Sequence, residues 1–226
     1  KTVHHAWMSA EPGVLFWDTI LRESVPDCYA DLGYRTVSTN PCGEIPLCPY
    51  DSCRLLAINL YSYVVNPFKP DAYFDFDLFK NHVALAQRIM DDIIDLELEK
   101  IERIMAKIDS DPENEDVKHT ESVLWQKIYK KSGQGRRTGV GITAEGDMLA
   151  ALGLRYGTEE ATEFAEKVHQ TVALSAYRSS VEMAKERGAF EVYDSEREKN
   201  NPFINRLREA DPELYEEMKK YGRRNI

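Results

Sequence analysis

Three chemically different side chains alternate along one short stretch: an amide at Asn40, a thiol at Cys42 and a carboxylate at Glu44. An amide can hydrogen-bond a ligand, a thiol can give up its hydrogen, and a carboxylate can accept a proton. In an extended chain, side chains two residues apart point the same way. The spacing therefore predicts that three different chemistries share one pocket.

The neighbouring residues support an extended conformation for this stretch. Pro41 and Pro46 fix their own φ angles, and each keeps the residue before it out of the helical region. Gly43 has no Cβ, which leaves room beside the thiol for another backbone segment or for a ligand to come close. We predict that residues 38–50, approximately, form a loop or strand tip that enters a cavity.

These residues also resemble a known family. Residues 40–44 read Asn-Pro-Cys-Gly-Glu, residues 46–47 read Pro-Leu, and residues 52–60 read Ser-Cys-Arg-Leu-Leu-Ala-Ile-Asn-Leu. This pattern resembles the catalytic finger loop and the following segment of ribonucleotide reductase large chains. The form with proline and glycine beside the cysteine is most similar to the adenosylcobalamin-dependent class II enzymes. Residues 11–16 and 136–141 also resemble segments of this family, so the resemblance runs along the whole chain.

The resemblance implies a role for each of the three residues. In this family the cysteine at the position of Cys42 carries a transient thiyl radical, which removes the 3′ hydrogen of the nucleotide ribose. Glu44 corresponds to the general base on the 3′ hydroxyl, and Asn40 to the amide that holds the sugar hydroxyls. The 2′ hydroxyl then leaves as water. The implied activity is the reduction of ribonucleotides to deoxyribonucleotides by an oxidoreductase.

The other cysteines divide into a candidate reductant and two bystanders. Cys53 matches one half of the family's redox-active cysteine pair, and the other half belongs to an earlier strand, upstream of residue 1. Cys28 and Cys48 do not match that position, and a lone buried cysteine usually acts as a small apolar residue. Cys42, Cys48 and Cys53 contain no C-x-x-C knuckle and have no histidine nearby, so we expect no zinc site.

Four more residues are candidates for positions next to the substrate: Pro41, Leu55, Arg136 and Arg137. The two arginines lie close to Gly139 and Gly141, where they could add to a phosphate or effector site. In the alternative interpretation they belong to a turn before a strand and pair with acidic neighbours. The sequence leaves both interpretations open.

The resemblance also implies a cofactor and partners. It implies adenosylcobalamin, a ribonucleoside di- or triphosphate substrate, a nucleotide effector, and a thioredoxin-like or C-terminal cysteine reductant, and it allows a homodimer. Two alternatives stay open. One is a class I large chain, which uses a separate radical-generating subunit, and the other is a non-catalytic fragment whose helices serve as an interaction surface.

Composition narrows the class of protein further. The chain has 226 residues, of which 42% are hydrophobic, enough to bury a core in one or two domains. A net charge of −10 disfavours general nucleic-acid binding, and no run is apolar and long enough to span a membrane. Four cysteines without a secretory signal indicate a reducing compartment, so we expect a cytoplasmic protein.

Acidic residues are frequent, but their spacing does not indicate a metal centre. A di-iron bundle needs two Glu-x-x-His pairs on facing helices, and only residues 166–169 fit that pattern. The acids of residues 91–99 are better explained as a solvated helix face, so we expect no metal site.

The predicted fold is α/β and rich in helix. The resemblance implies part of a ten-stranded α/β barrel with the finger loop through its centre, in a chain that is an internal part of a larger protein and inactive alone. Apolar periodicity and capping residues predict helices at about 14–24, 77–108 with an interruption at 95–100, 113–131 after an acidic break at 111–116, 143–152 with Thr143 as N-cap, 158–187 and 203–220. They also predict strands near 54–60 and 138–142. Residues 136–226 then form a second half-barrel segment.

Overall fold

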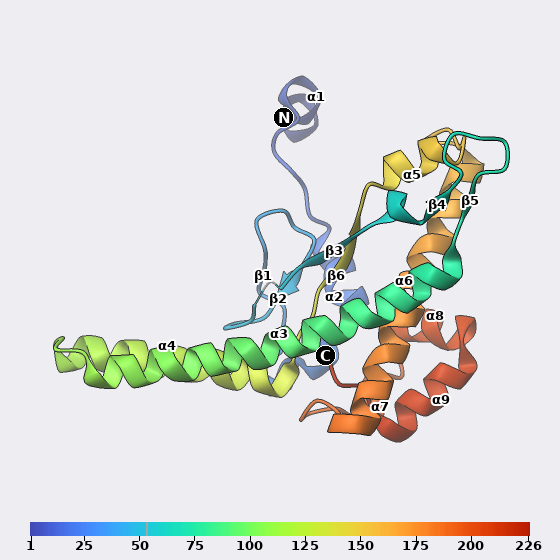
Figure 1. Ribbon diagram of the computed structural model, residues 1–226. Coiled ribbons are helices and arrows are strands. Elements are labelled where there is room, and N and C mark those ends of the chain that lie inside the picture. Colours follow the sequence, from blue (N-terminus) through green and yellow to red (C-terminus); the bar gives the residue numbers. More distant parts are fainter. Residues whose placement is uncertain (53) are drawn as a thin grey trace.

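Helices dominate the fold (Figure 1), which a computed structural model describes for residues 1–52 and 54–226. The α-helices are α1 (Thr2–Ser9), α2 (Trp17–Glu23), α3 (Phe76–Ser110), α4 (Glu115–Gly135), α5 (Glu145–Ala151), α6 (Glu159–Arg187), α7 (Ser195–Glu198), α8 (Pro202–Ala210) and α9 (Pro212–Tyr221). Two 3₁₀ helices are η1 (Pro26–Leu32) and η2 (Leu60–Tyr63). The strands are β1 (Ser38–Thr39), β2 (Pro46–Leu47), β3 (Leu56–Asn59), β4 (Val64–Val65), β5 (Tyr73–Phe74) and β6 (Val140–Thr143). The predicted helix-rich α/β class is therefore confirmed.

One parallel strand pair organises the centre of the molecule. β3 pairs with β6 in parallel, from Leu56 opposite Val140 to Asn59 opposite Thr143. Parallel neighbours need a long crossover connection, and here α3 and α4 provide it. The two backbones come so close at Gly139 that a Cβ there would lie 2.3 Å from the carbonyl oxygen of Arg54. Glycine at this position is therefore a condition for the pairing.

α3 and α4 form a long helical arm that projects from the rest of the molecule (Figure 1). α3 begins at Asp75, whose side chain accepts a hydrogen bond from the backbone N–H of Leu78 at 2.9 Å. The predicted interruption at residues 95–100 is wrong. Ile94, Ile101 and Ile108 are buried at seven-residue spacing across that region, which keeps the apolar face continuous.

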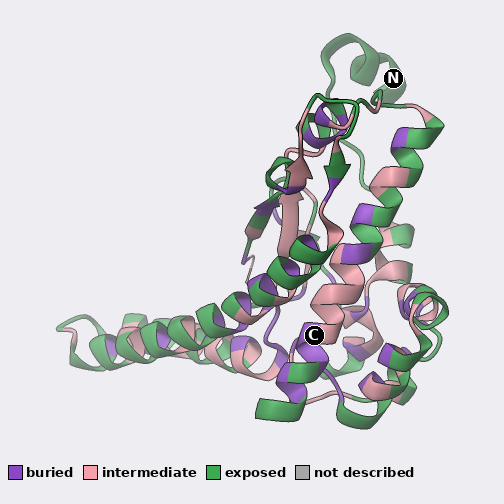
Figure 2. Cartoon of the chain, turned by 45° about the vertical axis from the view of Figure 1, so that its right-hand side comes forward, coloured by how far each residue is buried: buried purple, intermediate pink, exposed green. Residues whose placement is uncertain are grey.

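The main core lies where α3 and α6 meet the β3–β6 pair. Phe79 and Val83 of α3 and Val168 of α6 have no exposed surface, and Ile58 of β3 belongs to the same cluster. Figure 2 shows the buried stripes on the inner faces of the two helices, while the outer end of the arm is largely exposed. None of the helices in the described part of the chain is both long enough and apolar enough to cross a bilayer.

Helix ends test the sequence predictions most directly. α6 begins after Thr158 and ends before Gly188, as predicted. Thr143 does not cap α5, because it is the last residue of β6 and Ala144 occupies the N-cap position. The predicted final helix is split into α8 and α9 before Pro212, because proline disfavours a helical conformation at the preceding Asp211.

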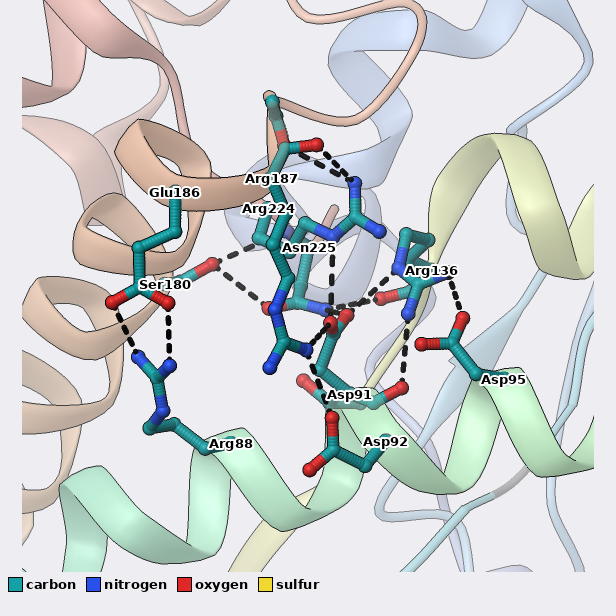
Figure 3. Close-up of polar contacts among 12 residues, drawn as sticks. Arg88, Asp91, Asp92, Asp95, Arg136, Ser180, Glu186, Arg187, Arg224 and Asn225 are labelled. Atoms are coloured by element: carbon teal, nitrogen blue, oxygen red, sulfur yellow. Dashed lines mark hydrogen bonds and ion pairs between the residues drawn. The ribbon is translucent and has the colours of Figure 1, made fainter.

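A buried carboxylate joins four separate parts of the chain (Figure 3). Asp91 of α3 has no exposed surface. Its Oδ1 accepts hydrogen bonds from Arg136 Nε at 2.7 Å and from Asn225 Nδ2 at 2.9 Å. Its Oδ2 accepts from Arg187 Nη1 and from Arg224 Nε, both at 3.3 Å. We call these five residues the Asp91 cluster; it ties α3 to the residue after α4, the end of α6 and the C-terminal segment.

Removal of the Asp91 charge should destabilise the protein. Asp91→Asn leaves three arginines without their shared buried carboxylate, and we expect a loss of about 3–5 kcal/mol in the free energy of unfolding. Urea unfolding followed by circular dichroism measures this loss. The matched control is Asp92→Asn, because that side chain is 58% exposed and pairs with Arg187 alone; we expect a change below about 1 kcal/mol. Equal losses in both variants would contradict the role of the cluster.

The same cluster predicts a pH dependence. Burial acts to raise the pKa of Asp91, but the hydrogen bond and charge of Arg136, with Asn225 and Arg224, outweigh it and hold the pKa below its usual value. A lowered carboxyl pKa adds stability above the unfolded-state value of about 3.9, and this stability disappears as the pH falls through the folded-state pKa. The stability gap between wild type and Asp91→Asn should therefore narrow below about pH 4 in acid titrations.

Candidate active site

Asn40, Cys42 and Glu44 lie in a hairpin formed by β1 and β2. Ser38 pairs with Leu47 and Thr39 with Pro46, so residues 40–45 form the tip. Asn40 is buried and closes this tip. Its backbone N–H donates to the Ile45 carbonyl at 3.1 Å, and its side-chain Oδ1 accepts from the Ile45 N–H at 3.0 Å.

The predicted extended conformation of the tip is wrong. Gly43 has a φ of +85°, and its N–H donates to the Asn40 carbonyl at 3.0 Å, so the chain turns here. The positive φ favours glycine, because a Cβ makes this region unfavourable. The neighbour of Gly43 is a side chain and not the predicted backbone segment: Leu15 Cδ2 lies 3.1 Å from where a Cβ would be.

The turn places the thiol and the carboxylate differently with respect to solvent and cavities. Cys42 is exposed at the tip. Glu44 is also exposed and lines two cavities of about 550 and 390 Å³. Both volumes lie within the range of small-molecule sites. The hairpin therefore presents an accessible thiol two residues from a carboxylate that faces room for a ligand.

The two arginines after α4 have different environments. Arg136 is buried, and its Nε and Nη1 donate to Asp91 and Asp95, both at 2.7 Å. It makes the pairs with acidic neighbours that one sequence interpretation predicted, so its guanidinium is not available to a phosphate. Arg137 lines both cavities with Glu44, and its Nε lies 2.9 Å from Asp51 Oδ2.

The remaining candidates next to the substrate lie at the edge of this site. Leu55 is exposed and lines the smaller cavity together with Glu44. Pro41 is exposed beside Cys42 in the hairpin tip. Cys53, the candidate redox cysteine, lies outside the described residues.

Cys48 and Cys28 have environments that suppress thiol chemistry. Cys48 is buried and its Sγ donates to Asp51 Oδ2 at 3.3 Å. Burial, with the charge of Asp51, raises the pKa of Cys48 to about 12. Burial also raises the pKa of Cys28. Both thiols are therefore poor sources of the thiolate that reacts or binds metal.

A cluster of metal-ligand side chains does occur in the described part of the chain, at Asp91, Asp92 and Asp95. Arg136 and Arg187 already pair with these three carboxylates. The cluster is therefore an ion-pair network, in which arginines supply the positive charge.

Two polar residues near the site were missed in the sequence analysis. Arg54 is buried and donates to the Arg137 carbonyl at 2.9 Å and to Ser132 Oγ at 2.8 Å, and its Nε contacts Glu97. Asp51 accepts from Cys48 and pairs with Arg137. A charged residue directly before the apolar run of β3 was the available signal for Arg54, because such a residue is buried only with partners.

Comparison with protein families identifies the class. The family model described as the ribonucleotide reductase barrel domain matches residues 1–226. The chain therefore belongs to the ribonucleotide reductase barrel-domain family, a family of enzymes.

Individual relatives of the chain are named reductases, some of them vitamin B12-dependent. The chain is 35% identical over 198 residues to a protein of Thermoplasma acidophilum named vitamin B12-dependent ribonucleoside-diphosphate reductase, covering 87% of this chain and 22% of the relative. It is 31% identical over 193 residues to a protein of the same name from Mycobacterium tuberculosis, covering 85% of this chain and 23% of that protein. A ribonucleoside-diphosphate reductase subunit alpha of Chlamydia pneumoniae is 28% identical over 159 residues, covering 69% of this chain and 12% of that protein. The chain thus spans less than a quarter of the length of these relatives.

The environments of the thiols predict their order of reaction. With iodoacetamide at pH 8, Cys42 should be alkylated before Cys48, because Cys42 is exposed, whereas Cys48 is buried and burial raises its pKa to about 12. Peptide mass spectrometry after timed quenching measures both rates. Cys42→Ser should remove the fast site and leave Cys48 slow. Faster labelling of Cys48 than of Cys42 in the folded protein would contradict this order.

Proposed function

We propose that this chain is the catalytic barrel part of an adenosylcobalamin-dependent ribonucleotide reductase. The observation that carries the proposal is the hairpin tip, which carries Asn40, Cys42 and Glu44 within five residues and puts Glu44 in the wall of two cavities. The names of the Thermoplasma and Mycobacterium relatives support the same activity and the same cofactor. The substrate is a ribonucleoside diphosphate, as in those names.

Each residue of the tip has a task that its position allows. Cys42 is exposed, so a substrate can reach its sulfur, which as a thiyl radical would take the 3′ hydrogen of the ribose and later return it. Glu44 would accept the proton of the 3′ hydroxyl. Asn40 uses Oδ1 to close the turn, so its Nδ2 is the group that would donate to a sugar hydroxyl.

The turn makes these positions reproducible. Two hydrogen bonds between Asn40 and Ile45 fix the base of the tip, and Gly43 sets its direction. Proximity contributes to the rate only when the reacting groups are held in a narrow range of geometries. We infer that Asn40 therefore supports catalysis twice, as a substrate ligand and as the closure of its own loop.

Adenosylcobalamin would supply the initiating radical, which is chemistry that protein side chains cannot provide alone. The exposed position of Cys42 fits this requirement, because a bulky cofactor can approach a thiol at a hairpin tip. The electrons for the reduction would come from Cys53 and a second cysteine outside this chain, regenerated by a thioredoxin-like or C-terminal cysteine reductant. A nucleotide effector, a homodimer and a cytoplasmic location complete the proposal.

The architecture is consistent with a segment of the ten-stranded barrel. β3 and β6 are parallel and joined by a helical crossover, which is the repeating unit of such a barrel. The β1–β2 hairpin comes directly before β3 in the sequence, where the family's finger loop belongs. We propose that further strands outside this chain complete the barrel around the hairpin.

The similarity to the Chlamydia subunit keeps a class I large chain as a second candidate. The two candidates differ in what starts the radical. Full-length protein that forms Co(II) with adenosylcobalamin and substrate supports our proposal. Activity that requires a separate small subunit and gives no cobalt signal would support class I.

Substitutions in the hairpin tip test the assigned roles. In the full-length protein with adenosylcobalamin and dithiothreitol, Cys42→Ser should abolish reduction of radiolabelled CDP, because an alcohol does not replace the thiol as a hydrogen donor. Glu44→Gln should reduce the rate by about 10² to 10⁴. Cys53→Ser should abolish deoxynucleotide formation, because half of the pair that supplies the two electrons is missing, while cobalt–carbon cleavage, followed as Co(II), continues. Product formation by each variant, measured with CDP and CTP, checks all three.

The matched control is Cys48→Ser, since Cys48 is a buried thiol on the same hairpin and has no assigned chemical role. We expect it to keep most of the activity if it folds. Unchanged product in Cys42→Ser would refute the proposed function.

A further inference from the structure

Arg137 is a buried cation in the wall of the cavities that Glu44 also lines. Its side chain is only 9% exposed. Nη1 donates to the Pro46 carbonyl on β2, and Nε lies 2.9 Å from Asp51 Oδ2, an ion pair without hydrogen-bond alignment. Arg137 therefore connects the segment before β6 to the β1–β2 hairpin.

Two nitrogen atoms of this guanidinium, Nε and Nη2, have no hydrogen-bond partner among the described residues, and only Nε has the charge of Asp51 beside it. Among residues 1–52 and 54–226, no acceptor lies within hydrogen-bond geometry of Arg137 Nη2, although the atom is buried. A buried N–H donor without a partner is costly, and proteins rarely keep one without a reason. Arg137 lines both cavities, so an oxygen of a bound molecule is a natural acceptor.

The charges around Arg137 indicate the kind of oxygen. Asp51 already balances the charge of the guanidinium, so Arg137 offers a hydrogen-bond donor with little net positive charge. Glu44 lies in the wall of the same cavities, and its carboxylate would repel a phosphate. A neutral hydroxyl accepts from a guanidinium and donates to a carboxylate at the same time. This combination suits a sugar hydroxyl better than a phosphate.

We propose that Arg137 is a substrate-binding residue, whose Nη2 donates a hydrogen bond to a ribose hydroxyl oxygen in the cavity shared with Glu44. This inference rests on the proposed function, because it takes a ribonucleotide as the ligand. The same guanidinium holds Pro46 through Nη1, so it sets the position of the hairpin relative to the sugar.

The test compares ligands that differ in one hydroxyl. Binding of CDP, 2′-deoxy-CDP and 3′-deoxy-CDP to the full-length protein is measured by calorimetry without adenosylcobalamin, so no turnover occurs. Wild type should bind CDP more tightly than at least one deoxy analogue. Arg137→Lys should weaken CDP binding by roughly tenfold to a hundredfold and leave the binding of that analogue nearly unchanged. The preference for the hydroxyl then disappears.

Comparing CDP with its deoxy analogues distinguishes a direct contact between Arg137 and the sugar from a role of Arg137 in holding the fold. Weakening of CDP and both deoxy analogues by the same factor would overturn the inference, because it would show that Arg137 only holds the hairpin. A loss seen with CDP and its deoxy analogues but not with cytidine would also overturn it, and would assign Arg137 to the phosphate. The control variant Arg103→Lys changes an exposed arginine of α3 and should alter none of these affinities.

A second variant covers the case in which Arg137→Lys does not fold. Arg137→Gln keeps an NH₂ donor without the charge, and it should show the same loss of hydroxyl preference if the guanidinium geometry is required. If wild type binds none of the nucleotides, the proposed function itself fails. If wild type prefers CDP and both variants keep that preference, only the inference about Arg137 fails.

Discussion

The structure depends on the burial of one carboxylate. A charge that loses its hydration must find opposite charges and hydrogen bonds within the protein. Asp91 finds them in Arg136, Arg187, Arg224 and Asn225, which come from distant parts of the sequence. Since each partner must reach the same two oxygen atoms, the cluster limits how α3, α6 and the segment before β6 can be arranged (Figure 3).

A chain of contacts leads from this cluster to the hairpin. Arg136 is held by Asp91, and the next residue, Arg137, contacts Asp51 and the Pro46 carbonyl. Arg54 adds a second tie, because it donates to the Arg137 carbonyl and to Ser132 Oγ. Two adjacent arginines thus have different roles: Arg136 pairs with Asp91 in the buried cluster, and Arg137 lines the cavities.

A buried ion pair between Arg223 and Glu198 stabilises the segment that precedes the hairpin. Arg223 donates to both carboxylate oxygens of Glu198, at 2.5 and 2.8 Å, and Tyr29 of η1 donates to the same carboxylate at 2.6 Å. This two-pronged contact is the strong form of an arginine–carboxylate pair. Because η1 precedes β1, the hairpin is supported on both its sides while Cys42 in its tip stays exposed. An exposed thiol on an anchored support is what a reaction with an incoming substrate requires.

Local sequence rules located the long regular elements, although they predicted an interruption of α3 at residues 95–100 that does not occur. Apolar residues at helical spacing located α3 and α6, and Thr158 and Gly188 marked the ends of α6, because caps and periodicity act over a few residues. The motif around Cys42 indicated the family, since residue types at short spacing carry that information directly. The same local rules misplaced the N-cap of α5 and missed the break before Pro212, where neighbouring residues compete.

The sequence by itself determined which residues are chemically able to act. For Arg136 and Arg137 it allowed two interpretations, a phosphate or effector site and pairs with acidic neighbours. Only the tertiary structure decided that the tip is a turn closed by Asn40, that Arg136 belongs to Asp91, and that Arg137 faces the cavities. The physical reason is range. A helix is selected by neighbours within four residues, whereas a buried charge is satisfied by partners that are 45 to 134 positions away along the chain.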